Sequence, residues 1–332
     1  MLKVGYFLYT RTPLGRTCHR RLIKKARAKG AHSVVQPSDV GTFSVLPVPM
    51  LSDNYGYLLI DHATGDAAAV DPCDAEVFLE VFSRAQETWL KERGLQLKLR
   101  KVLTTHYHHD HAGGNLQLAA CCPDLEIVGG QLETVPGATR QCQDGDELRV
   151  GRTRVRVLLT PCHTRGHIVF LCSAGGSVEG GPGDVARAPA VLFTGDCLFI
   201  GGVGKFFEGS ASQMYENLRR LSEELPEDTL VFPGHEYTMN NLLFARWVEK
   251  SNEHVSKKLV WAWQQRKQGL PTVPSTLGAE MLHNPFLRWD SAELAAFVKA
   301  ALPKEFPLSG EVPPASLIGA LRQMKDKGMH RK

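Results

Sequence analysis

Short apolar runs separated by turn-forming residues fill the chain between about residues 42 and 237. Runs of this length, bounded by Gly, Pro, Asn or Asp, are typical of β-strands. Two helices are expected among them, within 75–99, where Val77, Phe78, Val81 and Phe82 have helical spacing, and at 115–122. Strands or strand pairs are predicted at 42–51, 54–61, 65–72, 101–106, 125–130, 146–161 with a turn at Gly151, 166–173, 190–199 and 228–237.

The pattern changes after residue 240. The segments 243–267, 291–302 and 315–327 have helical periodicity, and the Gly- and Pro-rich stretch 173–189 is expected to be a surface loop. Strands alternating with helices favour the α/β class, with two sheets and helices outside them. We therefore predict an N-terminal extension (1–42), an α/β domain (43–239) and a C-terminal α-helical domain (240–332).

Charge is placed unevenly along the 332 residues. Residues 1–30 contain nine Lys or Arg and no acidic residue; removing these nine from 39 basic residues leaves 30 against 35 acidic ones, so the rest carries about −5. A nucleic-acid-binding role is therefore not favoured. The basic segment fits a mitochondrial targeting segment, a membrane-surface contact or a solvated arm. No apolar run approaches the roughly 18–20 residues that span a bilayer.

Eight cysteines are scattered without a Cys-x-x-Cys pair. In a chain of this length they indicate reduced thiols in an intracellular protein, cytoplasmic or mitochondrial. Membrane association through the basic N-terminus is a further alternative.

The stretch TTHYHHDHAGGN, from Thr104 to Asn115, concentrates the candidate chemistry. If it leaves a strand, His106 and His108 can face one way while Asp110 and His111 turn toward a neighbouring position. Two cations about 3.5–4 Å apart would fit two such ligand sets. Imidazole and carboxylate together suit Zn²⁺, Fe or Mn²⁺.

Three later segments each deliver one more candidate at the end of a predicted strand: TPCHTRGH with His163, FTGDCLF with Asp196 and FPGHEY with His235. Singly, each has an ordinary explanation, such as a turn histidine, an Asx turn or a helix start. Together they favour a metal centre, because a buried carboxylate is costly without a partner. His109 and His167 fit no ligand position and are interpreted as bystanders.

This combination resembles the metallo-β-lactamase superfamily. The resemblance implies an αββα sandwich with the site at strand ends between two sheets. It implies that the residues divide into a first metal set, a second set and a bridging carboxylate: His106, His108 and His163; Asp110, His111 and His235; and Asp196. All seven positions hold the superfamily's residue types.

Within the superfamily the chain is most similar to glyoxalase II, the hydroxyacylglutathione hydrolases. The similarity covers nearly everything from about residue 44 to the C-terminus, in the stretches LSDNYGYLLID, TTHYHHDHAGGN, LLTPCHTRGH, FTGDCLFIGG, GKFFEGS, GHEYTMNNLLFA and PTVPSTLGAEMLHNPFLR. In that family glutathione lies between the domains, where cationic groups would pair with its carboxylates. The resemblance implies substrate contacts from Lys205, Phe206, Phe207, Tyr237, Arg322 and Lys325.

Two positions depart from the family pattern. Val203 stands where the family has Cys, and Phe207 where Tyr is common. Loss of a phenol hydroxyl removes a hydrogen bond worth about 0.5–1.5 kcal/mol, which bears on glutathione affinity more than on catalysis. The N-terminal YTRTPLG with its basic run resembles a glyoxalase II-like branch named for paroxysmal nonkinesigenic dyskinesia, whose hydrolase activity is expected rather than established.

The predicted function is a binuclear metal-dependent hydrolase of S-(2-hydroxyacyl)glutathione thioesters, with S-D-lactoylglutathione as the first expected substrate. Two divalent ions, Zn²⁺ first and Fe or Mn²⁺ as alternatives, would generate hydroxide near neutral pH. Asp110 and Asp196 are the expected catalytic carboxylates, holding the ions and orienting the nucleophile. The leaving thiolate, whose conjugate acid has a pKa around 8.5, needs no general acid.

Two alternatives belong to other classes. A persulfide dioxygenase of the same fold would use one iron held by two His and one Asp, and would not need Asp110, His111 and His235. The completeness of that second set argues against it. Alternatively, the chain is a membrane-associated or partner-binding glyoxalase II-like protein with weak activity, for which Val203 and Phe207 leave room.

Overall fold

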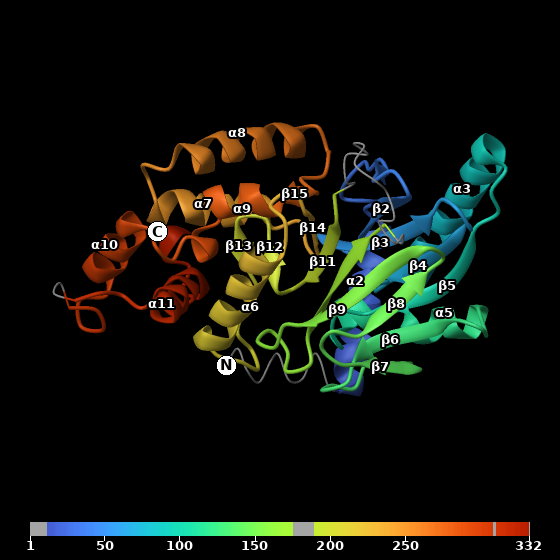
Figure 1. Cartoon of the computed structure of the whole chain (residues 1–332), viewed down its shortest axis with the longest axis horizontal. Coiled ribbons are helices and arrows are strands. Elements are labelled where there is room, and N and C mark those ends of the chain that lie inside the picture. The colour runs from blue at the N-terminus through green and yellow to red at the C-terminus, as the bar shows by residue number, and fades with distance from the viewer. Residues whose placement is uncertain (1–11, 175–188, 308–309, 332) are drawn as a thin grey trace, which may run out of the picture.

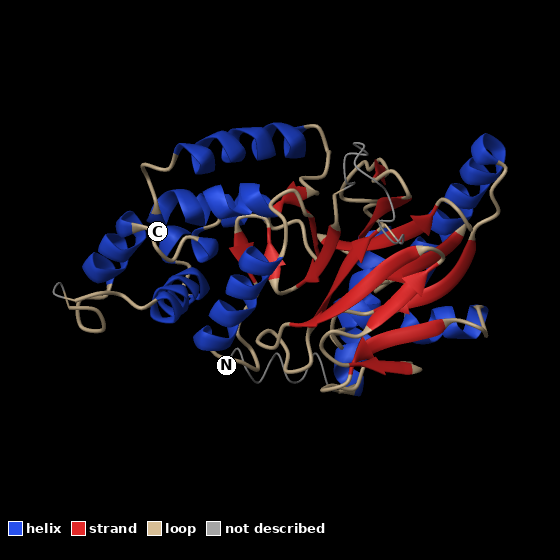
Figure 2. Ribbon diagram, viewed as in Figure 1, coloured by secondary structure: helices blue, strands red, loops and turns tan. Residues whose placement is uncertain are grey.

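The computed structural model of the chain describes residues 12–174, 189–307 and 310–331. Figure 1 and Figure 2 show a centre of β-strands with helices around it, and the C-terminal helices gathered at one end. Within the described residues, the first sheet has seven strands in sequence order, with β4 to β7 parallel to one another. Its strands are β1 (Ser38–Asp39), β2 (Phe43–Met50), β3 (Asn54–Asp61), β4 (Asp66–Val70), β5 (Lys98–Leu103), β6 (Glu126–Gly130) and β7 (Arg140–Cys142).

The second sheet, again counted over the described ranges, has six strands in the order β15-β14-β11-β10-β9-β8, and β11 runs parallel to β14. A separate short pair, β12 (Leu198–Phe199) and β13 (Gly202–Val203), follows β11. The predicted strand segments are confirmed, including the hairpin that turns at Gly151, whose φ is +57°. The sheet strands are β8 (Glu147–Val150), β9 (Thr153–Leu159), β10 (Ile168–Ser173), β11 (Val191–Gly195), β14 (Leu230–Pro233) and β15 (Ser275–Thr276).

Most buried apolar side chains fall into three large clusters, one between each pair of neighbouring layers. Adjacent residues of β3 point to opposite faces, so Leu59 lies in the cluster between the sheets while Leu58 packs with Phe78 of α3 (Ala75–Arg93). On the far side, Leu192 of β11 packs with Leu218 of α6 (Ala211–Glu224). The layers are therefore helix, sheet, sheet, helix, and the predicted αββα fold with C-terminal helices is confirmed.

Helix α3 is shorter than the segment 75–99 in which it was predicted. It ends at Arg93 because Gly94 adopts the left-handed conformation, with φ of 63°, and donates its N–H to Leu90 O. β5 then begins at Lys98. The helix predicted at 115–122 is confirmed as α5 (Asn115–Cys121).

The C-terminal segment 243–267 is not one helix, as the sequence periodicity suggested. α7 (Thr238–Val248) and α8 (Glu253–Lys267) are separate, because Asn252 caps α8 by accepting hydrogen bonds from the N–H groups of His254 and Val255. The two later helices are confirmed as α10 (Ala292–Ala301) and α11 (Pro314–Asp326). Between and after them lie α9 (Leu277–His283), η1 (Pro285–Leu287) and η2 (Met329–Arg331).

The basic N-terminal extension contains a helix that was not predicted, α2 (Pro13–Arg27), capped by Thr12, whose Oγ1 accepts from Gly15 N at 3.2 Å. An ion pair joins α2 to the two-sheet sandwich: Arg27 Nε lies 2.8 Å from Asp74 Oδ2. The residues before Thr12, and the predicted surface loop at 175–188, lie outside the described residues.

All eight cysteines lie in the described part of the chain and none is in a disulfide. Among the described residues, no helix has the length and apolar character needed to cross a bilayer.

Candidate metal centre

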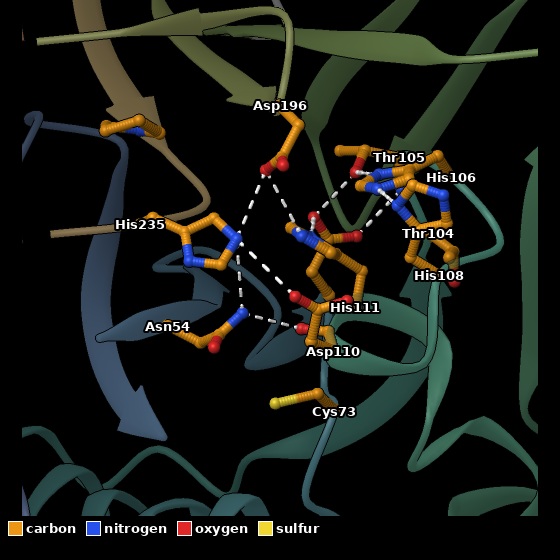
Figure 3. A network of polar contacts seen from close by, with 12 residues as sticks. Asn54, Cys73, Thr104, Thr105, His106, His108, Asp110, His111, Asp196 and His235 are labelled. Carbon is orange, nitrogen blue, oxygen red and sulfur yellow. Dashed lines mark hydrogen bonds and ion pairs between the residues drawn. The ribbon is translucent and has the colours of Figure 1, made fainter. Parts of the chain in front are cut away.

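The ends of four strands bring the seven predicted ligands together, and Figure 3 labels all of them except His163. After β5, a bent loop carries His106 and His108, and the single helical turn α4 (His109–Ala112) then turns Asp110 and His111 toward the neighbouring position. The remaining three follow strands of the second sheet: His163 after β9, Asp196 after β11 and His235 after β14. A site at the junction of the two sheets is therefore built from segments far apart in the sequence.

The first ligand set consists of three buried imidazoles whose ring nitrogens converge. Nδ1 of His108 lies 2.8 Å from Nε2 of His106 and 3.1 Å from Nε2 of His163. Burial, followed by the neighbouring imidazoles, holds the pKa of His106 and His108 well below the ordinary value. These rings are therefore neutral near pH 7, which is the form that binds a metal.

The second ligand set meets the first at Asp196. Its Oδ2 lies 3.3 Å from Nε2 of His163, whereas its Oδ1 lies 3.2 Å from Nε2 of His111 and 3.4 Å from Nε2 of His235. Asp110 Oδ2 completes the set, 3.7 Å from Nε2 of His235. One carboxylate thus faces both sets with different oxygens, the geometry expected of a bridge.

The hydrogen bonds that three ligand histidines make through Nδ1 leave Nε2 of each ring directed at the possible cation site. Nδ1 of His111 donates to Asp71, Nδ1 of His163 to Lys205 O and Nδ1 of His235 to Asp53, at 2.9, 3.0 and 2.9 Å. A neutral imidazole has one N–H, so each of these rings presents the Nε2 lone pair to the centre. Asn54 Nδ2 also lies 3.4 Å from Nε2 of His235, and the other lone pairs and carboxylate oxygens converge as in a ligand set for a divalent cation.

Electrostatics around the second set also favours positive charge. Burial alone would raise the pKa of Asp196, but the surrounding imidazoles hold it well below the ordinary value. Burial lowers the pKa of His111, yet the carboxylates of Asp196 and Asp71 raise it overall. Asp196 and His111 accordingly stabilise a positive charge between them, which a bound cation supplies. The buried His111 Nε2 and Asp196 Oδ1 have no hydrogen-bond partner among the described residues.

Residues outside the predicted set orient the ligands. Asp71 lies just after β4 with φ of +47°, and its two oxygens accept from the N–H and the hydroxyl of Thr105, both at 2.7 Å, and from His111. Asp53, in the turn between β2 and β3, orients His235. Their sequence signal is weak, since each is one acidic residue beside a turn, and only the fold brings it to a ligand.

His167 and His109, both interpreted as bystanders, behave differently. Nε2 of His167 accepts the main-chain N–H of Asp196 at 3.1 Å, and its Nδ1 lies 2.9 Å from Thr160 Oγ1. His167 therefore holds the backbone of the bridging residue in place, and it belongs to none of the possible metal-ligand groups among the described residues. His109 lies on α4 with its ring centroid 5.9 Å from that of His19.

The predicted substrate contacts fall into two groups. Phe207 and Tyr237 lie at the ligands: the Phe207 ring is 5.2 Å from that of His163, and the Tyr237 ring stacks on His235 at 4.5 Å. Lys205 is exposed on the same loop, with Nζ 5.8 Å from the Phe207 ring. This loop passes close to the centre, since a Cβ on Gly204 would meet Asp196 O at 1.9 Å.

The other predicted contacts are more deeply placed. Phe206 packs against the apolar cluster shared with the C-terminal helices. Arg322 is buried and donates from Nη1 to Val203 O at 2.9 Å, and Lys325 is buried and donates to Asn241 Oδ1. Arg322 thereby holds the segment that carries Lys205 against the C-terminal helices, whereas Lys325 joins α11 to α7. Arg322 Nε has no hydrogen-bond partner within the described ranges.

Two packed sheets with seven His and Asp ligands at their strand ends define a protein of the metallo-β-lactamase superfamily. A metallo-β-lactamase from Staphylococcus aureus subsp. aureus COL has a similar fold, with a TM-score of 0.50 and 22% identity over 82% of this chain and 67% of that one. Residues 236–328 match the family model of the hydroxyacylglutathione hydrolase C-terminus.

Two proteins similar in sequence show which family of this superfamily the chain belongs to. A cytoplasmic hydroxyacylglutathione hydrolase of Arabidopsis thaliana is 47% identical over 251 residues, which cover 75% of this chain and 90% of that protein. A hydroxyacylglutathione hydrolase-like protein of Gallus gallus is 42% identical over 279 residues, which cover 84% of this chain and 88% of that protein. The chain belongs to the hydroxyacylglutathione hydrolase family, as the sequence motifs predicted.

Proposed function

We propose that the protein is a metal-dependent hydrolase of S-(2-hydroxyacyl)glutathione thioesters, converting substrates such as S-D-lactoylglutathione into glutathione and a 2-hydroxy acid. The observation that carries the proposal is the convergence of buried imidazole nitrogens on the two oxygens of Asp196. Family membership supplies the reaction class, because the relatives are named for hydrolysis of hydroxyacylglutathione. We also propose the division into residues 1–42, 43–239 and 240–332.

We propose two divalent ions, with Zn²⁺ first and Fe or Mn²⁺ as alternatives that the same donors accept. His106, His108 and His163 would hold one, and Asp110, His111 and His235 the other, with Asp196 between them. When bound, such ions lower the pKa of a water molecule and provide hydroxide near neutral pH.

The chain's own groups position the reaction. Asp196 fixes the separation of the two ligand sets through its two oxygens. The side chain of Asp110 is 25% exposed, against 11% for Asp196, so it is the acidic ligand more open to an entering substrate and can orient the attacking water. No buried acid is needed opposite the leaving group, because a thiolate departs readily near neutral pH.

For the glutathione half, we propose contacts from the loop and helices at the first ligand set. Lys205 offers an exposed cation to a carboxylate, and Phe207 offers a ring face beside His163. Tyr237 borders the second set. Phe206, Arg322 and Lys325 stay in the proposed set. Phe206 and Arg322 support the loop, Lys325 holds Asn241 of α7, and Arg322 Nε retains a donor for a ligand oxygen.

The competing persulfide dioxygenase assignment needs only one iron with two His and one Asp. Here the potential ligand atoms of Asp110, His111 and His235 lie within 4.8 Å of one another. A second ligand set of this kind favours the hydrolase, because the dioxygenase does not need it. A small-molecule glutathione thioester is the proposed partner, and an intracellular location is proposed from the scattered free thiols. Contact of residues 1–30 with a membrane surface, or their use for mitochondrial targeting, stays a proposal.

The decisive experiment is hydrolysis of S-D-lactoylglutathione by purified, metal-loaded protein. The control is the His106→Ala/His108→Ala double variant, which loses two donors of the first set. Hydrolysis in the wild type alone, with two ions per chain by elemental analysis, supports the proposal. No hydrolysis above the control, or oxygen consumption with glutathione persulfide and one iron per chain, would overturn it.

A further inference from the structure

A cleft of about 680 Å³ opens beside the second ligand set. Its inner end is formed by Asp110, His235 and Tyr237, and its outer wall by α2 and the turn after it, including Lys25 and Lys29. This size is within the range of small-molecule sites. The N-terminal segment therefore forms part of the pocket that leads to the metal ligands.

Helix α2 is fastened in this position at several points. Arg27 pairs with Asp74, whose side chain is 2% exposed, and His19 Nε2 lies 3.2 Å from Cys73 O. These contacts join α2 to the segment between β4 and α3. The wall is consequently a fixed part of the catalytic domain.

The segment after α2 is held from the other side. Arg266 of α8 donates to His32 O at 2.7 Å and to Ser33 Oγ at 2.8 Å. His32 Nε2 in turn lies 2.9 Å from O of Asn54, the first residue of β3, which also borders the cleft. Residues of both the sandwich and the C-terminal helices thus set the width of the cleft.

The outer wall carries two cations, Lys25 and Lys29, that have no acidic partner in the described part of the chain. Lys25 and Lys29 are exposed, and neither forms an ion pair or side-chain hydrogen bond with any residue in the described ranges. The acids of the cleft are engaged elsewhere: Asp53 binds His235, and Asp110 belongs to the proposed metal ligands. The charge left at the mouth is positive, which favours an anionic group on the bound molecule.

The two halves of a thioester substrate have separate places in this geometry. Lys205 and Phe207, proposed for glutathione, lie beside His163 and His108 of the first ligand set, with the Phe207 ring 5.2 and 6.3 Å from theirs. The cleft beneath α2 instead begins at the second set. A scissile carbonyl held between the sets would direct the acyl group toward α2.

We propose that the cleft holds the acyl half of the substrate and that Lys25 and Lys29 bind a carboxylate on it. The preferred substrates are then glutathione thioesters of dicarboxylic acids. The inference rests on the proposed function for the hydrolytic step, whereas binding of the acyl carboxylate does not require hydrolysis.

The kinetic test compares S-succinylglutathione with its S-succinamoyl analogue, in which an amide replaces the carboxylate. We expect kcat/KM of the wild type to favour the carboxylate by about tenfold at low salt, the effect of two partly exposed ion pairs. Lys25→Glu/Lys29→Glu should abolish this preference and should lower kcat/KM for S-D-lactoylglutathione, which has no acyl carboxylate, much less than for S-succinylglutathione. Lys25→Arg/Lys29→Arg should retain the preference, as should Lys24→Glu, since Lys24 lies on α2 outside the cleft lining.

A binding test separates this inference from the proposed function. S-(3-carboxypropyl)glutathione and S-butylglutathione contain no thioester, and calorimetry gives their affinities directly. Tighter binding of the carboxylate compound to the wild type, lost in Lys25→Glu/Lys29→Glu, supports the inference even if no thioester is hydrolysed. Equal affinities in the wild type, or a preference retained in the double variant, would overturn it.

Discussion

Asp71 Oδ2 lies 2.9 Å from Nδ1 of His111, and the same carboxylate binds the backbone and hydroxyl of Thr105. One side chain after β4 therefore fixes both the ring orientation of a ligand and the start of the ligand-bearing segment after β5. Because the Asp71 carboxylate accepts a hydrogen bond from Nδ1–H of His111, a neutral ring keeps its lone pair on Nε2, the atom that would bind a metal.

Asp71→Asn is expected to weaken metal binding by about 10- to 100-fold, the usual cost of losing such an outer partner. Asn also tolerates the positive φ at this position, so the change removes charge and leaves the backbone intact. Chelator competition measures the affinity, with Asp124→Asn, a change at an exposed acid, as the control. Wild-type affinity in Asp71→Asn would show that the hydrogen bond does not support His111.

His167→Ala should lower the free energy of unfolding by about 1–3 kcal/mol, because the buried N–H of Asp196 loses its acceptor. Metal content after dialysis should fall as well, since the bridging carboxylate loses its support. Urea unfolding and elemental analysis measure the two effects. His109→Ala is the comparison, and an equal effect of the two substitutions would contradict the role given to His167.

Glu249→Gln should destabilise the C-terminal helices near neutral pH. Burial opposes ionisation of Glu249, but hydrogen bonds from Arg288, Asn252 and Ser291 lower its pKa below the ordinary value of 4.5. Its contribution is therefore complete above the unfolded pKa and is lost as pH falls through the folded pKa.

We expect Glu249→Gln to cost about 1.5–3 kcal/mol at neutral pH, the range for hydrogen bonds to a charged group. The difference from the wild type should shrink as the pH is lowered below about 4. Urea unfolding across this range is the measurement, and Glu305→Gln, at an exposed acid, is the control. A difference that stays constant down to acid pH would mean that the charge on Glu249 contributes nothing.

Lys205→Ala should raise KM for S-D-lactoylglutathione by about three- to tenfold and leave kcat nearly unchanged, since an exposed ion pair is made equally in the ground and transition states. Lys205→Arg should restore KM. The matched control is Lys304→Ala, at an exposed lysine of the C-terminal region. A fall in kcat with constant KM would instead place Lys205 at the reacting atoms.

Local sequence pattern determined most of the sandwich and all seven candidate ligands. The apolar runs at 54–61 and 190–199 became β3 and β11, and the ligands could be predicted because each follows such a run. Helix limits were predicted less well. The periodicity of residues 75–99 extends past Gly94, and that of 243–267 extends past the capping Asn252, because apolar spacing does not record which side chain caps a helix.

The sequence by itself determined which residue types stand at the strand ends, since strand periodicity and the His and Asp spacing are local properties. Tertiary structure alone decided which acids support them and what covers the site. Asp71 and Asp53 look like ordinary turn acids until long-range pairing brings them to His111 and His235. The basic segment 1–30 likewise has the composition of a solvated arm. Only packing against Asp74 shows that its helix α2 forms a wall of the cleft, because that contact joins residues 47 positions apart.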